Sequence, residues 1–593
     1  MKITSFWFLC LVVMCGSTQA QYVVKSSGEL ESLIKLPQEK TYLDHTGPVV
    51  FSGEYLNYAF YCFNVQSNKL SEISKIGYVS LINESKEMVF EHKLNIENGL
   101  AHGDFFLTTN IPTGKYKLLA YTNWMKNGGL QQLYKDDIII INPYISNPSF
   151  SSIFSNDKKL NNSKNDLIYK LDSSVISLKL PKESYGPREK VTLSIKNYKG
   201  LLGRGTYTIK VIKKNEIATK PVLSAIEYAT QFSTAKNQVQ PKIENYVFLP
   251  EQRGELFFGS ISDSVTGIAI EDAPVLLSIP GEGFLFQFSK TDEDGLFFFY
   301  LKKGYNKGKA VIQVDEKFRS YTINKGKIKN LDFDNLNFQE LNASKNYENI
   351  IKERSIQNQL ENLFFEAKPD SILSDDNYET YYLGKPEVFY LDEYTRFPTF
   401  EETLLEVIKF AGYREGGSRS DYIKITQDVK IYKEALDNLP AIVLIDGVFI
   451  LEHEKIKKFD ASRIDKISLF RGQLSLGGKI YHGILSIDTL DENFLEYYNI
   501  KNGLVTDLVK PFPVKNYYKQ KYDGDNPNIS RIPDYRRLLF WQPHLKINSE
   551  IIDLEFFTSD IEGEFEISLN GFTTYGKPIS NKISFEVLKD LSH

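Results

Sequence analysis

The chain has 593 residues, which at roughly 150 residues per domain predicts about four domains. Lys and Arg number 71 and Asp and Glu 76, and this near balance, with a net charge of -5, disfavours a nucleic-acid binder with a strongly basic face. The three cysteines are too few for a disulfide framework or a zinc site of four thiolates. The 36 Tyr and 40 Phe suit half-buried pleated surfaces, so the chain is predicted to be mainly β.

Residues 1–20 have the pattern of a signal peptide. A positive start precedes an apolar run at 6–14, and Thr18-Gln19-Ala20 is a small-residue cleavage site, which predicts a mature chain that begins at Gln21. The apolar run is shorter than the roughly 20 residues that a membrane-spanning helix needs. The alternative is a lipid anchor at Cys15, which we rank second. We therefore expect an exported protein without a transmembrane segment of its own.

Residues 21–150 are predicted to form a β-sandwich. From Thr41 onward, apolar and polar residues alternate in runs that turn residues interrupt about every ten positions, which is typical of sandwich strands. Cys62 lies in one of the apolar runs, and we expect it to be a buried structural thiol. Gly53-Glu54 and the pattern P-x-G-x-Y-x-L-x-A-Y-T at 112–122 resemble the macroglobulin-type β-sandwich.

A weaker copy of the same pattern follows, in which Tyr185, Pro187, Arg188 and Val191 occur in the same order. This resemblance implies a second macroglobulin-like sandwich over 167–245. The stretch that joins the two sandwiches is rich in Asn, Ser and Lys, which is typical of a linker.

Residues 246–335 are predicted to form a third, smaller sandwich. Their pattern T-D-x-x-G-x-F-x-F resembles the transthyretin-like or carboxypeptidase-regulatory-like sandwiches of exported bacterial proteins, and it implies a tight turn at Asp292 and Gly295. Calcium binding by Asp292 and Asp294 is the weaker interpretation, because calcium takes about six to eight oxygen ligands and this loop offers few.

A helical linker is predicted over 336–394. At 343–365 the apolar residues recur at helical spacing, and Gly and Pro are absent. A second helix is predicted from residue 400 to 411, with Thr399 as its N-cap and Gly412 after its end.

Residues 395–495 carry the most specific pattern of the chain. An apolar strand, an Asp-Gly turn, a short helix, a strand, a Gly-rich stretch and a closing strand resemble the plug domain of TonB-dependent outer-membrane receptors. The matching residues are Asp446, Gly447, Ile464, Ile467, Gly472, Gly477, Gly483, Ile487 and Thr489. The resemblance implies a small inserted α/β domain.

We expect no barrel after this plug-like domain within the given sequence. A barrel of 22 strands with about 9 to 11 residues each needs on the order of 200 residues. Only 103 residues follow Leu490, and their alternation predicts one C-terminal sandwich over 496–593. The patterns at 534–543 and 556–563 resemble a Bacteroidota family that combines macroglobulin-type modules, a carboxypeptidase-regulatory-like sandwich and a plug without a barrel.

The predicted fold is thus a series of tandem Ig/macroglobulin-like β-sandwiches with one inserted α/β plug-like domain and a linker helix. Loops carry function when a rigid scaffold positions them. We therefore expect the Asp-Gly turn and the Gly-rich stretch at 471–483 to lie exposed and to contact a protein partner. The predicted contact residues are Asp446, Gly447, Arg471, Gly472, Ser475, Gly477, Gly478 and Lys479.

Motifs for chemistry are missing from the sequence: we find no His-Glu-x-x-His, no phosphate loop and no G-x-S-x-G elbow. We expect no enzyme, no cofactor and no metal. The leading hypothesis is an exported scaffold of the periplasm or outer membrane whose plug-like domain docks a component of a transport or secretion complex. The alternative is a surface module that binds a polysaccharide or a protein, with Trp124, Tyr517 and Trp541 as a stacking platform.

Overall fold

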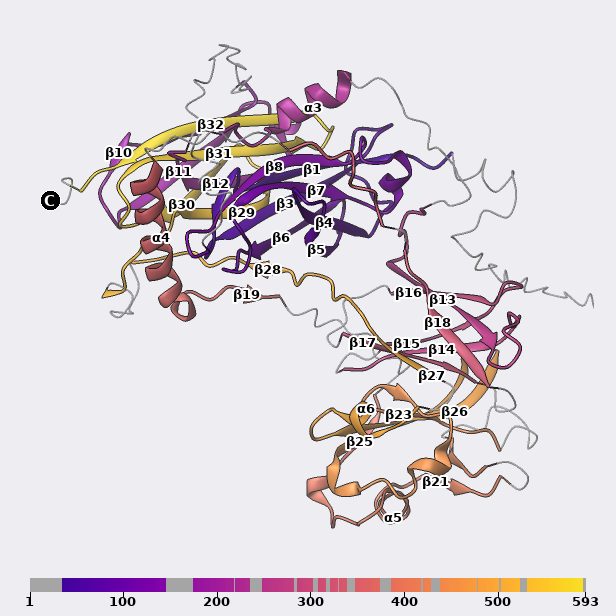
Figure 1. Ribbon diagram of the computed structural model, residues 1–593. Coiled ribbons are helices and arrows are strands. Elements are labelled where there is room, and N and C mark those ends of the chain that lie inside the picture. The colour runs from indigo at the N-terminus through magenta and orange to yellow at the C-terminus, as the bar shows by residue number, and fades with distance from the viewer. Residues whose placement is uncertain are drawn as a thin grey trace, which may run out of the picture.

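The computed structural model of the chain is mainly β, as predicted, and its elements form two lobes (Figure 1). It describes residues 35–145, 174–217, 219–234, 248–281, 285–301, 308–315, 320–328, 330–338, 347–373, 385–416, 420–427, 438–476, 478–500, 503–522 and 531–589. The predicted signal peptide and Cys15 lie outside these residues. Among the residues described, no helix is long and apolar enough to cross a membrane.

The first sandwich occupies the upper lobe and lies within the predicted range 21–150. Its smaller sheet has the order β1 (Glu39–His45), β3 (Tyr55–Asn64), β6 (Leu100–Phe106), and its larger sheet the order β2 (Val49–Phe51), β8 (Tyr134–Ile141), β7 (Gly114–Tyr121), β4 (Ile76–Asn83), β5 (Met88–Asn95). Cys62 is a free, fully buried thiol in β3, as predicted.

A second sandwich combines two segments that the sequence analysis assigned to separate domains. One segment supplies β9 (Ile176–Lys179), β10 (Ser184–Tyr185), β11 (Lys190–Asn197) and β12 (Gly205–Lys213), and the other β29 (Leu538–Ile547), β30 (Ile551–Phe557), β31 (Gly563–Thr573) and β32 (Pro578–Val587). The sheets have the orders β10-β32-β31-β12-β29 and β30-β11-β9. The expected sandwiches at 167–245 and 496–593 are therefore one domain, because β12 pairs with β29 and β31, and β11 pairs with β30 as well as with β9. We call it the split sandwich.

The third sandwich begins the lower lobe and is also completed from afar. It contains β13 (Glu255–Asp263), β14 (Pro274–Ile279), β15 (Leu285–Lys290), β16 (Leu296–Leu301), β17 (Lys309–Val314), β18 (Tyr321–Lys325) and β27 (Gly503–Asp507). One sheet has the order β16-β13-β18 and the other β15-β14-β17-β27. The Asp292 carboxylate accepts hydrogen bonds from the backbone N–H groups of Asp294 and Leu296, which is the tight turn that the sequence predicts.

The small α/β domain forms the rest of the lower lobe. Its mixed sheet has the order β20 (Glu387–Tyr390), β25 (Ile464–Leu476), β26 (Lys479–Thr489), β23 (Ile442–Ile445), β24 (Val448–Phe449). The helices α5 (Phe400–Glu406) and α6 (Phe494–Tyr497) and the hairpin of β21 (Ala411–Arg414) and β22 (Tyr422–Ile425) complete the domain. Because β20 lies in the range predicted as linker, the domain begins before residue 395.

Helix α5 confirms its predicted start but not its predicted end. The Thr399 side chain accepts a hydrogen bond from the Glu402 N–H at 3.3 Å, which is the expected N-cap. The helix ends at Glu406, because residues 411–414 pair with β22 instead of continuing the helix. Gly412 therefore lies in a strand rather than after a helix.

Helix α4 (Glu348–Leu363) confirms the predicted linker helix, and it packs on the upper lobe. Beyond it, β19 (Ser371–Ile372) pairs with β28 (Lys515–Asn516), so that the chain leaving the upper lobe and the chain returning to it lie side by side (Figure 1). A further helix, α3 (Ala225–Thr234), contacts β32 and β31 within the range predicted as pure sandwich.

Candidate functional site

The predicted Asp446-Gly447 turn forms, but it is not exposed. The two residues link β23 and β24 with φ angles of 49° and 80°, as a two-residue hairpin turn requires. The Asp446 carboxylate is only 7% exposed and accepts hydrogen bonds from the Thr489 N–H and hydroxyl, both at 2.7 Å, and from the Phe494 N–H at 3.0 Å. It joins the closing strand to α6, so the expected exposure of this turn is wrong.

The Gly-rich stretch at 471–483 is a β-hairpin rather than a loop. Gly472 lies in β25 and Gly483 in β26, where the register between the strands shifts after Phe470. At Gly483 the φ angle is 85° and a Cβ atom would lie 2.5 Å from the carbonyl oxygen of Phe470. These glycines therefore permit a β-bulge in a long hairpin, which explains why they could be mistaken for loop residues.

Two charged residues of this hairpin are engaged within the protein. The Arg471 guanidinium lies 3.8 Å from the ring centre of Phe410, and its Nε donates to the Thr426 carbonyl at 3.0 Å. Lys479 forms an ion pair of 2.5 Å with Asp315 of the third sandwich. Ser475, Gly478 and Lys479 are exposed at the hairpin tip, and their partner contact stays a prediction. Gly477 lies outside the described residues.

Of the aromatic residues named for a stacking platform, the two Trp side chains are buried and Tyr517 is half-buried. Trp124 and Trp541 are 6% and 4% exposed, and Trp124 Nε1 donates to the Pro37 carbonyl at 2.8 Å. Tyr517 and Trp541 do come together, with their ring centres 6.4 Å apart. Both line a cavity of about 520 Å³, so the structure places these two side chains at an internal site rather than on a platform.

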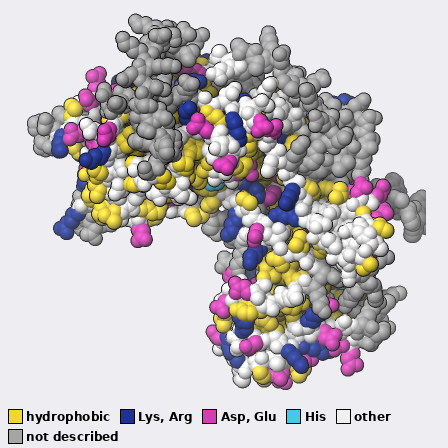
Figure 2. All heavy atoms as spheres, in the orientation of Figure 1, with side chains coloured by type: hydrophobic (Ala, Val, Ile, Leu, Met, Phe, Trp, Pro, Cys, Tyr) yellow, Lys and Arg dark blue, Asp and Glu magenta, His cyan; other side chains and the backbone are white. Residues whose placement is uncertain are grey.

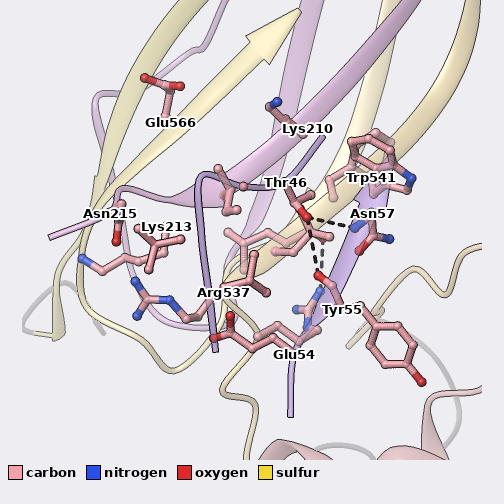
Figure 3. Close-up of a pocket in the computed structure, with 18 of the residues that line it drawn as sticks. Thr46, Glu54, Tyr55, Asn57, Lys210, Lys213, Asn215, Arg537, Trp541 and Glu566 are labelled. Carbon is pink, nitrogen blue, oxygen red and sulfur yellow. Dashed lines mark hydrogen bonds between the residues drawn. The ribbon is translucent and has the colours of Figure 1, made fainter. Parts of the chain in front are cut away.

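This cavity, which we call the junction cavity, lies where the first sandwich, the split sandwich and α4 meet (Figure 3). Its wall comes from the β1–β3 connection at 46–57, the end of β12 at 210–215, the start of β29 at 537–541 and one face of α4. Sequence reasoning missed it because many segments that lie far apart in the chain build it. The only signal in the sequence was the aromatic content of 534–543.

On the α4 side of the cavity, both carboxylate oxygens of Glu54 already accept hydrogen bonds. Arg354 donates to both oxygens of Glu54 at 2.7 Å, and the Asn358 amide and the Phe51 N–H add hydrogen bonds of 3.0 and 2.9 Å. Burial alone would raise the pKa of the Glu54 carboxyl, but the adjacent Arg354 charge outweighs it and holds that pKa below its usual value. Glu54 therefore stays ionised, and its charge is compensated by Arg354.

Arg537 lies in the same part of the cavity without such a partner. No hydrogen bond or ion pair of its guanidinium occurs within the described part of the chain. Burial, followed by the nearby Arg354 charge, lowers the pKa of Arg537 to about 10, so the group is still a cation at neutral pH. A half-buried cation without an ion pair is uncommon, which makes Arg537 the most unusual residue of the wall.

The other cations of the wall are paired. Lys210 contacts Asp44 at 2.5 Å, Lys582 contacts Glu566 at 3.0 Å, and Arg536 contacts Asp534 at 2.6 Å. The remaining pairs are Lys368 with Glu361, Lys214 with Glu564 and Lys213 with Glu216. Arg537 is thus the one lining cation that lacks an ion pair among the residues described.

The opposite wall has unpaired neutral groups. Figure 3 shows Lys213, Asn215 and Arg537 on one side and Asn57 and Trp541 on the other. Trp541 Nε1 and Asn57 Oδ1 are buried and have no hydrogen-bond partner in the described residues. Buried polar groups are normally paired, and leaving one unpaired costs about 1–3 kcal/mol. The cavity wall therefore holds a cation, a donor and an acceptor that the protein itself does not satisfy.

Metal binding finds no support in the side-chain geometry. Among the described residues, no group of three or more His, Cys, Asp or Glu could hold a metal ion.

A search of protein-family models and a search of curated proteins both find no match. Of the solved structures, Escherichia coli alpha-2-macroglobulin activated by porcine elastase is similar at 9% identity over 93% of this chain and 44% of that one, with a TM-score of 0.23. Salmonella alpha-2-macroglobulin reacted with methylamine is similar at 9% identity over 93% of this chain and 39% of that one, with a TM-score of 0.23. The Escherichia coli adhesin FdeC is similar at 9% identity over 46% of this chain and 58% of that one, with a TM-score of 0.13.

This chain therefore spans less than half the length of the alpha-2-macroglobulins it matches. At these TM-scores the description of the fold rests on the sheets and registers given above.

Proposed function

We propose that the chain is a non-enzymatic, exported scaffold of the cell envelope that binds a protein partner. What supports a scaffold is the way its domains are connected. After β18 of the third sandwich the chain adds α4 to the upper lobe, then forms the α/β domain, and afterwards returns to the third sandwich as β27 and to the split sandwich as β29. The chain therefore connects the two lobes more than once, which holds them together more firmly than a single flexible linker would.

An exposed apolar patch is the observation that carries the proposal. It consists of Leu363, Phe365, Ile372, Leu373 and Val514, whose exposed fractions range from 39% to 72%. These residues lie at the end of α4 and on the β19–β28 pair, and hydrophobic side chains gather on this side of the upper lobe in Figure 2. Exposed apolar clusters on monomers commonly mark protein-binding surfaces. We call this surface the apolar patch.

The α/β domain provides the second contact in the proposal, because its sequence resembles a receptor plug domain. Its edge strand β20 pairs only with β25 among the described strands, and it exposes Val388 and Tyr390 at 39% and 50%. An unpaired edge strand can accept a strand from another chain. The tip residues Ser475, Gly478 and Lys479 lie in the same domain. A component of an outer-membrane transport or secretion complex is the partner we propose.

The proposal is tested by co-purification from solubilised envelopes of the source cells. Tagged full-length protein should recover one partner in stoichiometric amount, and the double variant Leu363→Ser/Ile372→Ser should lose it. The matched control is Leu201→Ser/Leu202→Ser, because these residues are similarly exposed, at 61% and 60%, but lie on the split sandwich away from the patch. Equal recovery by both double variants would refute a role for the apolar patch.

The alternative of a surface polysaccharide-binding module is weakened by the burial of Trp124 and Trp541, which leaves it without the expected stacking platform. Binding to immobilised glycans without a protein partner would restore it.

A further inference from the structure

We infer that the junction cavity is a binding site for a monocarboxylate with an apolar body, and that Arg537 binds its carboxylate. This inference goes beyond the proposed scaffold role and does not depend on it. No residue predicted from the sequence as a partner contact lies in the cavity wall.

The size of the cavity suits a small organic ligand. Its volume of about 520 Å³ lies within the range of roughly 300–1,000 Å³ that is typical of small-molecule sites. Apolar side chains from three elements line it, among them Val49, Val50 and Leu538. Sites of this kind combine an apolar wall with a few polar groups that orient the ligand, and the wall described above has that composition.

The charges in the wall define which group is bound. Glu54 cannot bind a cation, because both of its oxygens already accept hydrogen bonds from Arg354. Arg537 remains as the lining cation without an ion pair among the described residues, and a guanidinium presents parallel N–H donors that match a carboxylate or a phosphate. Lys213 and Arg354 already pair with Glu216 and Glu54, and the charges of these two carboxylates also act on Arg537, so they would repel a dianion more than a monoanion. This favours a monoanionic carboxylate over a dianionic phosphate.

The remaining polar groups orient the body of the ligand. Trp541 and Asn57 lie across the cavity from Arg537 (Figure 3). Trp541 Nε1 and Asn57 Oδ1 have no hydrogen-bond partner among the described residues, so this wall offers one donor and one acceptor to the body of a ligand. Two sources share this chemistry: a free organic acid, and the C-terminal carboxylate of a peptide.

Ligand-observed NMR with the full-length mature protein tests the inference. The probes are butyrate, octanoate and hydrocinnamate, their neutral amides, and short apolar peptides with a free or an amidated C-terminus. We expect the acids or the free-carboxylate peptides to bind and their amides not to bind. Binding by the small acids identifies a free acid as the source, and binding by the peptides alone identifies a peptide. If no carboxylate binds, or if the amides bind equally well, the inference is wrong.

Substitution of Arg537 locates the binding. Arg537→Gln should lower the affinity for the acids by about tenfold or more, since it removes a charge-assisted pair, and Arg537→Lys should retain part of it. The control Lys582→Gln removes a lining cation that is already paired, and it should leave the affinity unchanged. Because the Arg537 guanidinium has no hydrogen bond or ion pair among the described residues, Arg537→Gln should keep or raise the melting temperature. Unchanged affinity in folded Arg537→Gln would overturn the assignment.

Discussion

Arg188 and Asp560 lie 372 positions apart in the sequence, yet Nε and Nη2 of Arg188 each contact a carboxylate oxygen of Asp560 at 2.6 Å. The pair connects the two segments of the split sandwich. Asp560 in turn accepts a hydrogen bond from the Asp534 N–H at 2.9 Å, so the return of the chain from the lower lobe is fixed at the same place. The N-terminal strands of this domain are therefore complete only after the C-terminal strands have joined them.

Asp534 should be the most sensitive ionic residue of this junction. Its carboxylate is 1% exposed and accepts hydrogen bonds from Arg536 and Tyr522 at 2.5–2.7 Å. Burial alone would raise the pKa of Asp534, but Arg536 outweighs it and lowers that pKa to about 2. We predict that Asp534→Asn lowers the free energy of unfolding by about 3–5 kcal/mol, because Arg536 is left buried without its counter-charge.

Chemical denaturation of the split sandwich measures this loss. The control Glu564→Gln breaks an exposed pair with Lys214 and should cost at most about 1 kcal/mol. Equal effects of the two substitutions would contradict the role of Asp534.

Glu251 should make stability depend on pH. It lies at the entry to the third sandwich, is 2% exposed and accepts a hydrogen bond from the Tyr78 hydroxyl at 3.0 Å. Burial, followed by the charge of Glu255, raises the pKa of Glu251 from 4.5 to about 7. The folded protein then holds the Glu251 proton more tightly than the unfolded chain does. The resulting contribution to the free energy of unfolding is complete below pH 4.5 and is lost as the pH rises through 7.

We predict that this loss reaches about 3 kcal/mol and that Glu251→Gln removes it from the pH profile of unfolding. The exposed Glu293→Gln serves as control and should leave the profile as it is. If the free energy of unfolding of the wild-type protein rises between pH 5 and 8 instead of falling, the assignment is wrong.

Gly483 and Gly478 allow the backbone strain caused by an added Cβ atom to be measured with and without a steric clash. Both have positive φ angles, 85° and 77°, but only Gly483 faces a backbone atom, while a Cβ at Gly478 would meet nothing within 4 Å. We predict a loss of about 1 kcal/mol for Gly478→Ala from backbone strain, and about 3 kcal/mol for Gly483→Ala, where a steric clash adds to it. Thermal unfolding of both variants checks this, and equal losses would exclude a β-bulge at Gly483.

Local features of the fold could be predicted from the sequence, whereas the partners of distant strands could not. The Thr399 cap, the turn at Asp292 and the burial of Cys62 depend on nearby residues or on one strand, and all three are confirmed. Alternation identified β12 and β31 as strands, but it contains no information on which strands pair. The Asp446 turn was predicted for the same local reason, while its buried carboxylate depends on Thr489 and Phe494.

The candidate site was beyond sequence reasoning for a related reason. The sequence favours Trp541 and Tyr517 as a surface platform because aromatic side chains often bind ligands. It does not indicate how deeply each side chain is buried. The unpaired state of Arg537 depends on what α4 and the β1–β3 connection place around it, and neither is adjacent in the sequence.

Site-specific photo-crosslinking in the source cells tests the central claim, that the chain is a scaffold with a protein partner at the apolar patch. A photoreactive residue would replace Ile372, which is 66% exposed in the patch, or Leu201, which is 61% exposed outside it. The account predicts one dominant adduct of a single envelope protein from position 372 and none from position 201. No adduct from position 372, or the same adducts from both positions, would contradict it.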